Sequence, residues 1–129
     1  MLNAQSLILN KPHSDYHNIT AYQKAKTLAK QVISLSDQLP KNRAYDAIYL
    51  QLVRSSTSIG ANLVEGYGRN NSREYRQFLG IARGSSLESE YWLELVQETT
   101  NINTKALLDI NTEIIKLLTT TIKNLRIHT

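Results

Sequence analysis

Residues 43–68 read RAYDAIYLQLVRSSTSIGANLVEGYG, and the spacing of their apolar side chains is that of a long α-helix. One stripe, with alternating steps of four and three, contains Tyr45, Tyr49, Leu52, Ser56, Ile59 and Leu63. A second stripe beside it contains Leu50, Val53, Thr57, Gly60 and Val64. Two such stripes predict a helix that packs against neighbours on more than one side.

The middle of this segment is rich in small residues. Residues 55–58 read SSTS and are poor helix formers, and Gly60 costs about 1 kcal/mol relative to alanine in a helix. Small residues inside a helix usually permit another backbone to come close, so we expect a tight helix crossing there. Gly66 and Gly68 then supply the end of the helix.

Helical periodicity recurs on both sides of this segment. The sequence predicts four helices, at about residues 18–39, 43–68, 72–100 and 104–127. The apolar stripe of the first helix contains Ala25, Leu28, Val32, Leu35 and Leu39. In the third helix, Gly80 and residues 84–86 again indicate a closely packed centre.

The connections between these helices are short. Pro40 ends the first helix, because proline disfavours helical backbone in the residue before it. Residues 70–72 read NNS, a turn followed by an N-cap, and Asn103 or Thr104 caps the last helix. We therefore expect an all-α, antiparallel up-down-up-down four-helix bundle that forms one domain over residues 1–129, with an N-terminal arm at 1–17.

The composition is that of a globular domain, with 41% hydrophobic and 20% charged residues among 129. The absence of Cys excludes disulfide scaffolds, thiolate zinc sites, iron–sulfur clusters and Cys nucleophiles. No apolar run approaches the roughly 18–20 residues that span a bilayer, and the N-terminus lacks the marks of a signal peptide. The sequence therefore predicts a cytoplasmic protein that does not enter a membrane.

Residues suited to chemistry are few. His13, His17 and His128 lie near the chain ends, and no Glu-x-x-His motif is present. His13 and His17 have helical spacing, but Pro12 precedes them, so two solvated side chains explain them better than a metal site. The serines lie within helices that lack a central histidine to act as a base. We expect no metal or other cofactor, and no enzymatic activity.

Charge is more informative, because the net value of +4 is unevenly distributed. Arginines lie near the start of the third helix and glutamates fill its second half. The candidate residues for binding nucleic acid are Arg69, Arg73, Arg76, Lys24, Lys116 and Lys123. Tyr67 and Tyr75 are candidate stacking surfaces for bases. Alternatively, the arginines pair with Glu65, Glu74 or Glu88, within one chain or across a subunit boundary, and spacing alone favours this pairing.

A row of polar residues also follows one face of the second helix: Arg54, Ser58, Asn62 and Glu65. Buried unpaired polar groups are costly, so we expect these residues to bond across to Arg83 or Glu88. Our hypothesis is that this polar ladder (Arg54, Ser58, Asn62, Glu65, Arg83 and Glu88) fixes the packing register within the bundle or between subunits.

Four linked segments resemble the signature of a known bacterial family. They are RSSTSIGANLVEGYGR at 54–69, SREYRQFL at 72–79, IARGSSLE at 81–88 and YWLEL at 91–95. The family comprises small four-helix-bundle proteins whose genes were first noticed inside intervening sequences of 23S rRNA genes. Its recurrent positions match Ser58, Asn62, Glu65, Gly66, Arg69, Phe78, Arg83, Gly84 and Glu88 here. Val64, Ser86 and Ser89 depart mildly from the pattern.

The resemblance implies a ring-like homo-oligomer, usually a pentamer, and a role in binding nucleic acid such as ribosomal RNA. Accessory proteins of diversity-generating retroelements are similar; they form basic pentameric barrels and bind a reverse transcriptase and nucleic acid. The family has no established catalytic residues to transfer. Two functions follow as hypotheses: a homo-oligomer that binds RNA through its basic surface, or a scaffold that docks a partner such as a reverse transcriptase.

Overall fold

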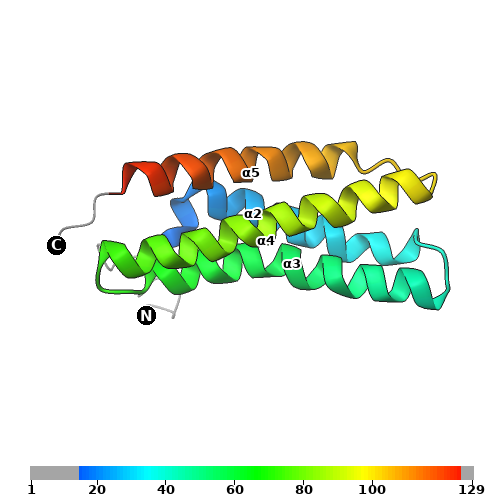
Figure 1. Ribbon diagram of the computed structural model, residues 1–129, viewed down its shortest axis with the longest axis horizontal. Helices are drawn as coiled ribbons and strands as arrows, with labels where there is room; N and C mark the ends of the chain where they lie inside the picture. Colours follow the sequence, from blue (N-terminus) through cyan, green and yellow to red (C-terminus); the bar gives the residue numbers. More distant parts are fainter. Residues whose placement is uncertain (1–14, 126–129) are drawn as a thin grey trace, which may run out of the picture.

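The computed structural model describes residues 15–125 and consists of four long helices (Figure 1). The helices are α2 (Thr20–Ser34), α3 (Arg43–Tyr67), α4 (Ser72–Thr99) and α5 (Lys105–Asn124), with short 3-10 turns η1 (Tyr16–Asn18) and η2 (Leu35–Asp37) on either side of α2. Consecutive helices pack against each other, and α2 also packs against α5, which closes the bundle. The predicted all-α, up-down four-helix bundle is confirmed.

Several sequence expectations about the ends of the chain fall outside the described residues. These are residues 1–14 of the predicted N-terminal arm, His13, His128 and the predicted last residues of the fourth helix. The first helix is shorter at its C-terminal end than the predicted range of 18–39. The α-helix ends at Ser34, and residues 35–37 tighten into η2, a common way to finish a helix before a proline.

Asparagine side chains begin the two central helices. The Asn42 side-chain oxygen accepts a hydrogen bond from the Tyr45 amide at 3.0 Å, and Asn71 does the same for the Glu74 amide at 2.9 Å. Each bond satisfies one amide of the first turn that has no partner inside the helix. Asn103 accepts from the Lys105 amide at 2.9 Å in the same manner, whereas the Thr104 hydroxyl makes no cap bond.

The core lies along the axis of the bundle and receives side chains from all four helices. The predicted stripe of the first helix is entirely buried: Ala25, Leu28, Val32, Leu35 and Leu39 are each at most 6% exposed. Burial of such apolar surface is the main favourable contribution to folding. The second predicted stripe of α3 is less buried, and its Leu50 remains 65% exposed.

Serines pack α3 closely against α4, as the small residues of the sequence predict. The Ser55 and Ser89 hydroxyl oxygens lie 2.8 Å apart in a fully buried pair, and those of Ser58 and Ser85 lie 2.9 Å apart. Each pair satisfies two hydroxyls in the small volume between two backbones, and the Ser58–Ser85 pair is only partly buried. We call these four residues the serine seam.

Two glycine expectations are wrong. Gly66 does not end α3, which continues to Tyr67; a Cβ on Gly66 would lie 2.5 Å from the Phe78 Cβ, so this glycine lets α4 come close. Gly80 and Gly84 do not lie at a packed centre. A Cβ built on either would meet no atom within 4 Å, which shows that both face outward from the bundle.

A second polar contact inside the core joins α4 to α5. Asn111 is fully buried; its Oδ1 accepts from the Ser86 hydroxyl at 2.6 Å and its Nδ2 donates to the Ser86 carbonyl oxygen at 2.9 Å. Among residues 15–125, no buried side-chain nitrogen or oxygen is without a hydrogen-bond partner. The buried polar side chains therefore help to fix how the helices pack against each other, and none of them is left without a hydrogen bond in the described part of the chain.

Candidate nucleic-acid interface

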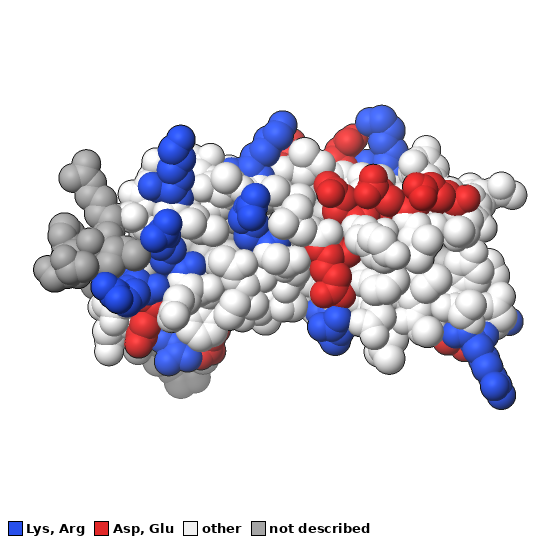
Figure 2. All heavy atoms as spheres, viewed as in Figure 1, with Lys and Arg blue, Asp and Glu red and all other residues white. Residues whose placement is uncertain are grey.

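Positive side chains gather on one half of the face formed by α4 and α5. Figure 2 shows most of the Lys and Arg of this face on the side where α3 joins α4, and a group of Asp and Glu beyond the middle of the molecule. The chain reverses between α4 and α5, so the first half of α4 lies beside the second half of α5. This arrangement brings the α4 arginines and the α5 lysines to one end of the bundle.

A shallow groove of about 440 Å³ lies between these two helices. Its lining residues are Arg76, Gly80, Arg83, Thr119, Ile122 and Lys123. Arg83 is held in place because its Nε donates to the Thr119 hydroxyl at 2.8 Å. The absent side chain of Gly80 keeps the groove open between the two arginines. We call this hollow, with its three cations, the basic groove.

Within residues 15–125, the cations of the basic groove have no acidic partner. The ion pairs of these residues involve other cations. No ion pair with a described residue is formed by the cations of this end of α4 and α5: Arg73, Arg76, Arg83, Lys116 and Lys123. Seven residues separate Arg76 from Arg83, as they do Lys116 from Lys123, a step of about 10.5 Å along a helix. Two rows of positive charge therefore run side by side.

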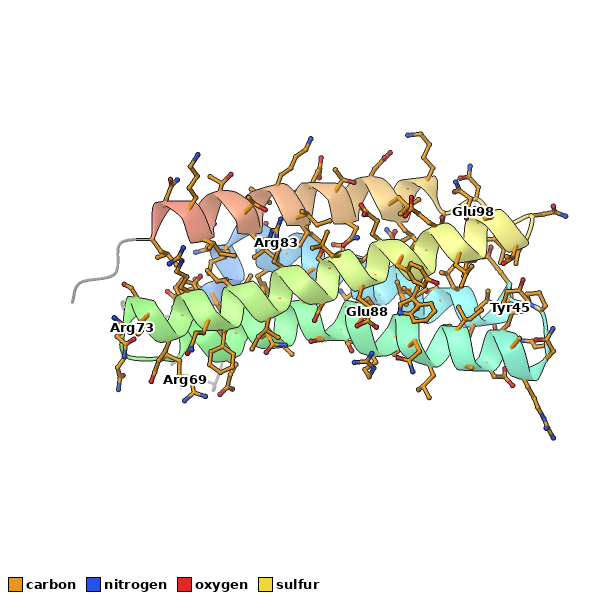
Figure 3. The ribbon with its side chains drawn as sticks, viewed as in Figure 1. Tyr45, Arg69, Arg73, Arg83, Glu88 and Glu98 are labelled. Carbon is orange, nitrogen blue, oxygen red and sulfur yellow. The ribbon has the colours of Figure 1, made fainter. Side chains whose placement is uncertain are left out.

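Two of the six candidate cations are already engaged. The Arg69 guanidinium bonds Glu65 at 2.5 Å and lies 4.8 Å from the centre of the Phe78 ring. Lys24 contacts Glu113 at 2.7 Å. Within one chain, the pairing alternative thus applies to Arg69, as spacing favours, whereas Arg73, Arg76 and Arg83 form no ion pair with a described residue. Figure 3 shows Arg69 and Arg73 at the same end of the bundle.

The polar ladder forms only in part. An Arg54 guanidinium nitrogen donates to Glu88 Oε2 at 2.8 Å, and the Trp92 indole donates to the same oxygen at 2.9 Å. Ser58 joins the serine seam, and Asn62 bonds back to the Ser58 hydroxyl within α3.

Two members of the ladder do not join α3 to α4 within one chain. Arg83 reaches toward α5 instead of α3, because its side chain leaves α4 on the side of Thr119. Glu65 bonds Arg69, one turn away on its own chain segment, and does not cross to α4. Among residues 15–125, Arg54 and Glu88 form the ion pair that joins α3 to α4, and Figure 3 shows Glu88 on the α3 side of α4.

The two candidate stacking residues pack against each other. The rings of Tyr67 and Tyr75 meet edge to face with their centres 6.1 Å apart, and Tyr16 approaches Tyr67 in the same way at 6.2 Å. Edge-to-face contacts of this kind stabilise the protein beyond the area they bury. Burial, and secondarily the nearby Tyr67, raise the pKa of Tyr75 above its usual value of 10.0.

The raised pKa predicts a loss of stability in alkaline solution. An unfolded tyrosine ionises near pH 10, before Tyr75 does in the native protein, so the stability that its neutral form contributes is lost as pH rises above about 10. Urea unfolding across this range should show a steeper decline for the wild type than for Tyr75→Phe. Tyr91→Phe is the matched control, since it removes a tyrosine hydroxyl from a side chain that is 60% exposed; an equal slope in all three proteins would contradict the prediction.

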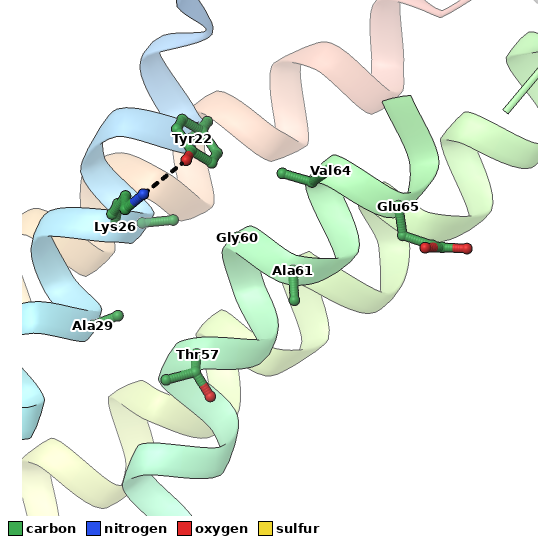
Figure 4. A pocket seen from close by; sticks show the side chains of 9 residues that line it. Tyr22, Lys26, Ala29, Thr57, Gly60, Ala61, Val64 and Glu65 are labelled. Carbon is green, nitrogen blue, oxygen red and sulfur yellow. Dashed lines mark hydrogen bonds between the residues drawn. The ribbon is translucent and has the colours of Figure 1, made fainter. Parts of the chain in front are cut away.

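Other parts of the described chain offer little chemistry. Residues 15–125 contain no group of three His, Cys, Asp or Glu placed to hold a metal ion, and His17 Nδ1 lies 3.2 Å from Asp15. A second hollow, between α2 and α3, is mostly apolar and is lined by Ala29, Gly60 and Val64 among others (Figure 4). None of the described helices is long and apolar enough to cross a membrane.

Three residues that shape this region were not singled out by sequence. Thr119 and Ile122 line the basic groove, and Asn111 joins α5 to α4 through Ser86. A signal for Asn111 exists: it continues the step of four and three from Leu107 to Ile114, where an apolar residue is expected. A polar residue at such a position indicates a buried hydrogen bond. Thr119 carries no comparable signal.

Comparisons with known proteins agree with this architecture. The family described as 23S rRNA-intervening sequence protein matches residues 17–122. A solved structure that is similar is the crystal structure of a protein with unknown function from the S23 ribosomal protein family of Bacteroides thetaiotaomicron VPI-5482. The TM-score is 0.70 and the identity is 29%, over 81% of this chain and 99% of that chain. No curated protein matches the sequence.

Proposed function

Because the chain belongs to the 23S rRNA-intervening sequence protein family, we propose that it binds RNA without sequence specificity through the basic groove. The observation that carries the proposal is the set of cations at one end of α4 and α5 that have no acidic partner among the described residues. Phosphates supply the missing negative charge, and release of their counterions drives association.

The arrangement of the groove suits a phosphate backbone more than a small ligand. The hollow is open along its length, and Arg76 and Lys123 are exposed on opposite sides of it. Arginine can hold a phosphate through two parallel N–H bonds, whereas lysine acts as a point charge. No aromatic face lines the groove, so the interaction is electrostatic and reads no bases. Assembly into a homo-oligomer, which the family resemblance implies, would multiply these contacts.

Binding should weaken steeply with salt and depend on the groove residues. Each phosphate contact contributes about 0.7–0.9 to the slope of log affinity against log salt. The double variant Arg76→Gln/Lys123→Gln removes two contacts, so the slope should fall by about 1.4–1.8, and affinity near 0.1 M salt by roughly 30-fold. Fluorescence anisotropy with a labelled rRNA fragment measures both quantities.

The matched control is Arg43→Gln/Lys105→Gln. It makes the same charge change at the first residues of α3 and α5, which lie at the end of the bundle away from the basic groove. Its slope should remain that of the wild type. Equal loss in both double variants, or affinity that does not vary with salt, would refute the proposal. Recovery of a partner enzyme such as a reverse transcriptase without RNA, in a pull-down from the native host, would support the scaffold alternative instead.

A further inference from the structure

The hollow between α2 and α3 is a mostly apolar groove of about 440 Å³. Figure 4 shows Ala29 of α2 and Val64 of α3 pointing into the space between the two helices, with Gly60 and Ala61 beside them on α3. Apolar surface of this kind is costly to leave in water, and grooves between helices commonly bind an apolar segment of polypeptide. We call this hollow the α2–α3 groove.

The charged side chains that line the α2–α3 groove are already engaged. Lys26 and Glu65 are the two charged residues of its lining. Lys26 Nζ donates to the Tyr22 hydroxyl at 3.2 Å, as Figure 4 shows, and lies 5.6 Å from the centre of the Tyr22 ring. Glu65 accepts from Arg69 on the same helix. The groove therefore suits a segment that is apolar and carries no charge.

The described part of the chain begins at one end of this groove. The Tyr16 ring meets Tyr22 of α2 edge to face, with 5.1 Å between ring centres, and meets Tyr67 of α3 in the same way at 6.2 Å. Tyr16 therefore lies where α2 begins and α3 ends, in contact with both helices. Because Tyr22 also lines the groove, the residues that precede Asp15 join the described chain at this end of the groove.

An uncharged apolar segment lies within reach of the groove. Residues 1–10 read MLNAQSLILN and contain no charged side chain, and residues 7–9 are three consecutive aliphatic residues. Ile8 is seven residues before Asp15, a length of up to about 23 Å when extended. The groove follows α2 from Tyr22 to Ala29, about 10.5 Å along a helix. Residues 7–9 can therefore reach every part of it.

We propose that residues 7–9 bind in the α2–α3 groove of their own chain. A segment joined to the groove by a short stretch of chain is present there at a millimolar effective concentration, which an apolar peptide from another protein would have to exceed. The bound segment ties the beginning of the chain to α2 and α3 and closes the groove to other apolar segments.

The contact is separate from the other features of this protein. The family match covers residues 17–122, so residues 7–9 lie outside the part of the chain that the family describes. The basic groove lies between α4 and α5, whereas this groove lies between α2 and α3. The inference therefore does not depend on the proposed RNA binding.

Disulfide trapping in the full chain tests the contact, and the absence of native Cys makes every disulfide assignable. In glutathione buffer, Ile8→Cys/Ala29→Cys should form a disulfide within one chain at least tenfold faster than Ile8→Cys/Thr27→Cys. Thr27 is exposed on α2, does not line the groove and is closer to Tyr22 along the helix than Ala29 is. The same comparison with Leu7→Cys in place of Ile8→Cys covers the neighbouring register.

The mass of the products decides the outcome. Non-reducing mass spectrometry distinguishes a disulfide within the 14.7 kDa chain from one that joins two chains. Equal rates for the groove pairs and their controls would overturn the proposal. A disulfide that forms mainly between two chains would also overturn it, because the segment would then bind another copy.

Proteolysis gives a second measurement that needs no change in residues 7–9. Thermolysin cuts before Leu and Ile, and it should cut at residues 7–9 at least tenfold faster in Ala29→Glu than in the wild type, because a charge in the groove opposes an apolar segment. Thr27→Glu adds the same charge outside the groove and should be cut at the wild-type rate. Equal rates in all three proteins would contradict the proposal. Circular dichroism checks that both variants retain their helices.

Discussion

Asn111→Asp is expected to lower the free energy of unfolding by about 3–5 kcal/mol at neutral pH, because it places a charge with no cationic partner in the core. The second carboxylate oxygen would face the Ser86 carbonyl oxygen, where Asn111 Nδ2 now donates at 2.9 Å. Two acceptors then oppose each other where a hydrogen bond had been. The first oxygen keeps the bond from the Ser86 hydroxyl.

Acid should reverse most of this loss. A protonated carboxyl can donate to the Ser86 carbonyl oxygen as the amide does, so folding raises the pKa of the new carboxyl above about 3.9. Stability relative to the wild type is then largest below pH 4 and declines as pH rises. Urea unfolding at about pH 4 and pH 7 measures the difference.

Thr112→Asp is the matched control, because it adds the same charge at the next, exposed residue of α5. It should cost far less at pH 7 and show little recovery in acid. If the two variants lose equal stability at pH 7, the hydrogen bonds between Asn111 and Ser86 do not stabilise the contact between α4 and α5.

Gly66→Ala is expected to lower the free energy of unfolding by about 3 kcal/mol, the upper part of the range for overpacked positions. The new Cβ would lie 2.5 Å from the Phe78 Cβ and 3.1 Å from the Tyr75 ring. A Cβ is fixed to its backbone and cannot rotate away, so α3 and α4 must separate. Thermal unfolding followed by circular dichroism should show a melting temperature lower by roughly 10 °C.

A second glycine of the same helix provides the comparison. A Cβ on Gly60 would lie 3.7 Å from the Ala25 Cβ, an ordinary contact. Gly60→Ala should therefore stabilise the protein by about 0.5–1 kcal/mol, because alanine loses less backbone entropy in a helix. A Gly66→Ala protein that melts with or above Gly60→Ala would show that the two helices have room to move apart at little cost.

The fold was predictable because it depends on periodicity, which is local in the sequence. The stripe from Ala25 to Leu39 and the short connections were sufficient to infer four packed helices. The direction in which a small residue faces was not predictable. Gly66, Gly80 and Gly84 look alike in the sequence, yet the first meets Phe78 and the other two face outward. That difference depends on the rotation of α3 and of α4 about their axes, which the neighbouring helices determine.

The candidate site was predictable to a similar extent. Arg69 and Glu65 are four residues apart, so their ion pair follows from helix geometry. Arg83 and Thr119 lie on different helices and are 36 residues apart in the sequence, so no local pattern predicts their contact. The sequence also does not show which candidate cations are free to bind phosphate. Arg69 and Lys24 pair with acids, whereas Arg76 and Lys123 do not pair with a described residue, and this depends on where the folded chain places its acids.

The separation of charge along α4 also affects how the protein moves before it touches anything. With cations at one end of a helix about 42 Å long and carboxylates toward the other, this face has a permanent electric dipole along the bundle. Near a polyanion such a molecule experiences a torque that turns its positive end forward. Salt limits this effect to about the last 8 Å of approach at physiological ionic strength, so the protein orients only just before contact.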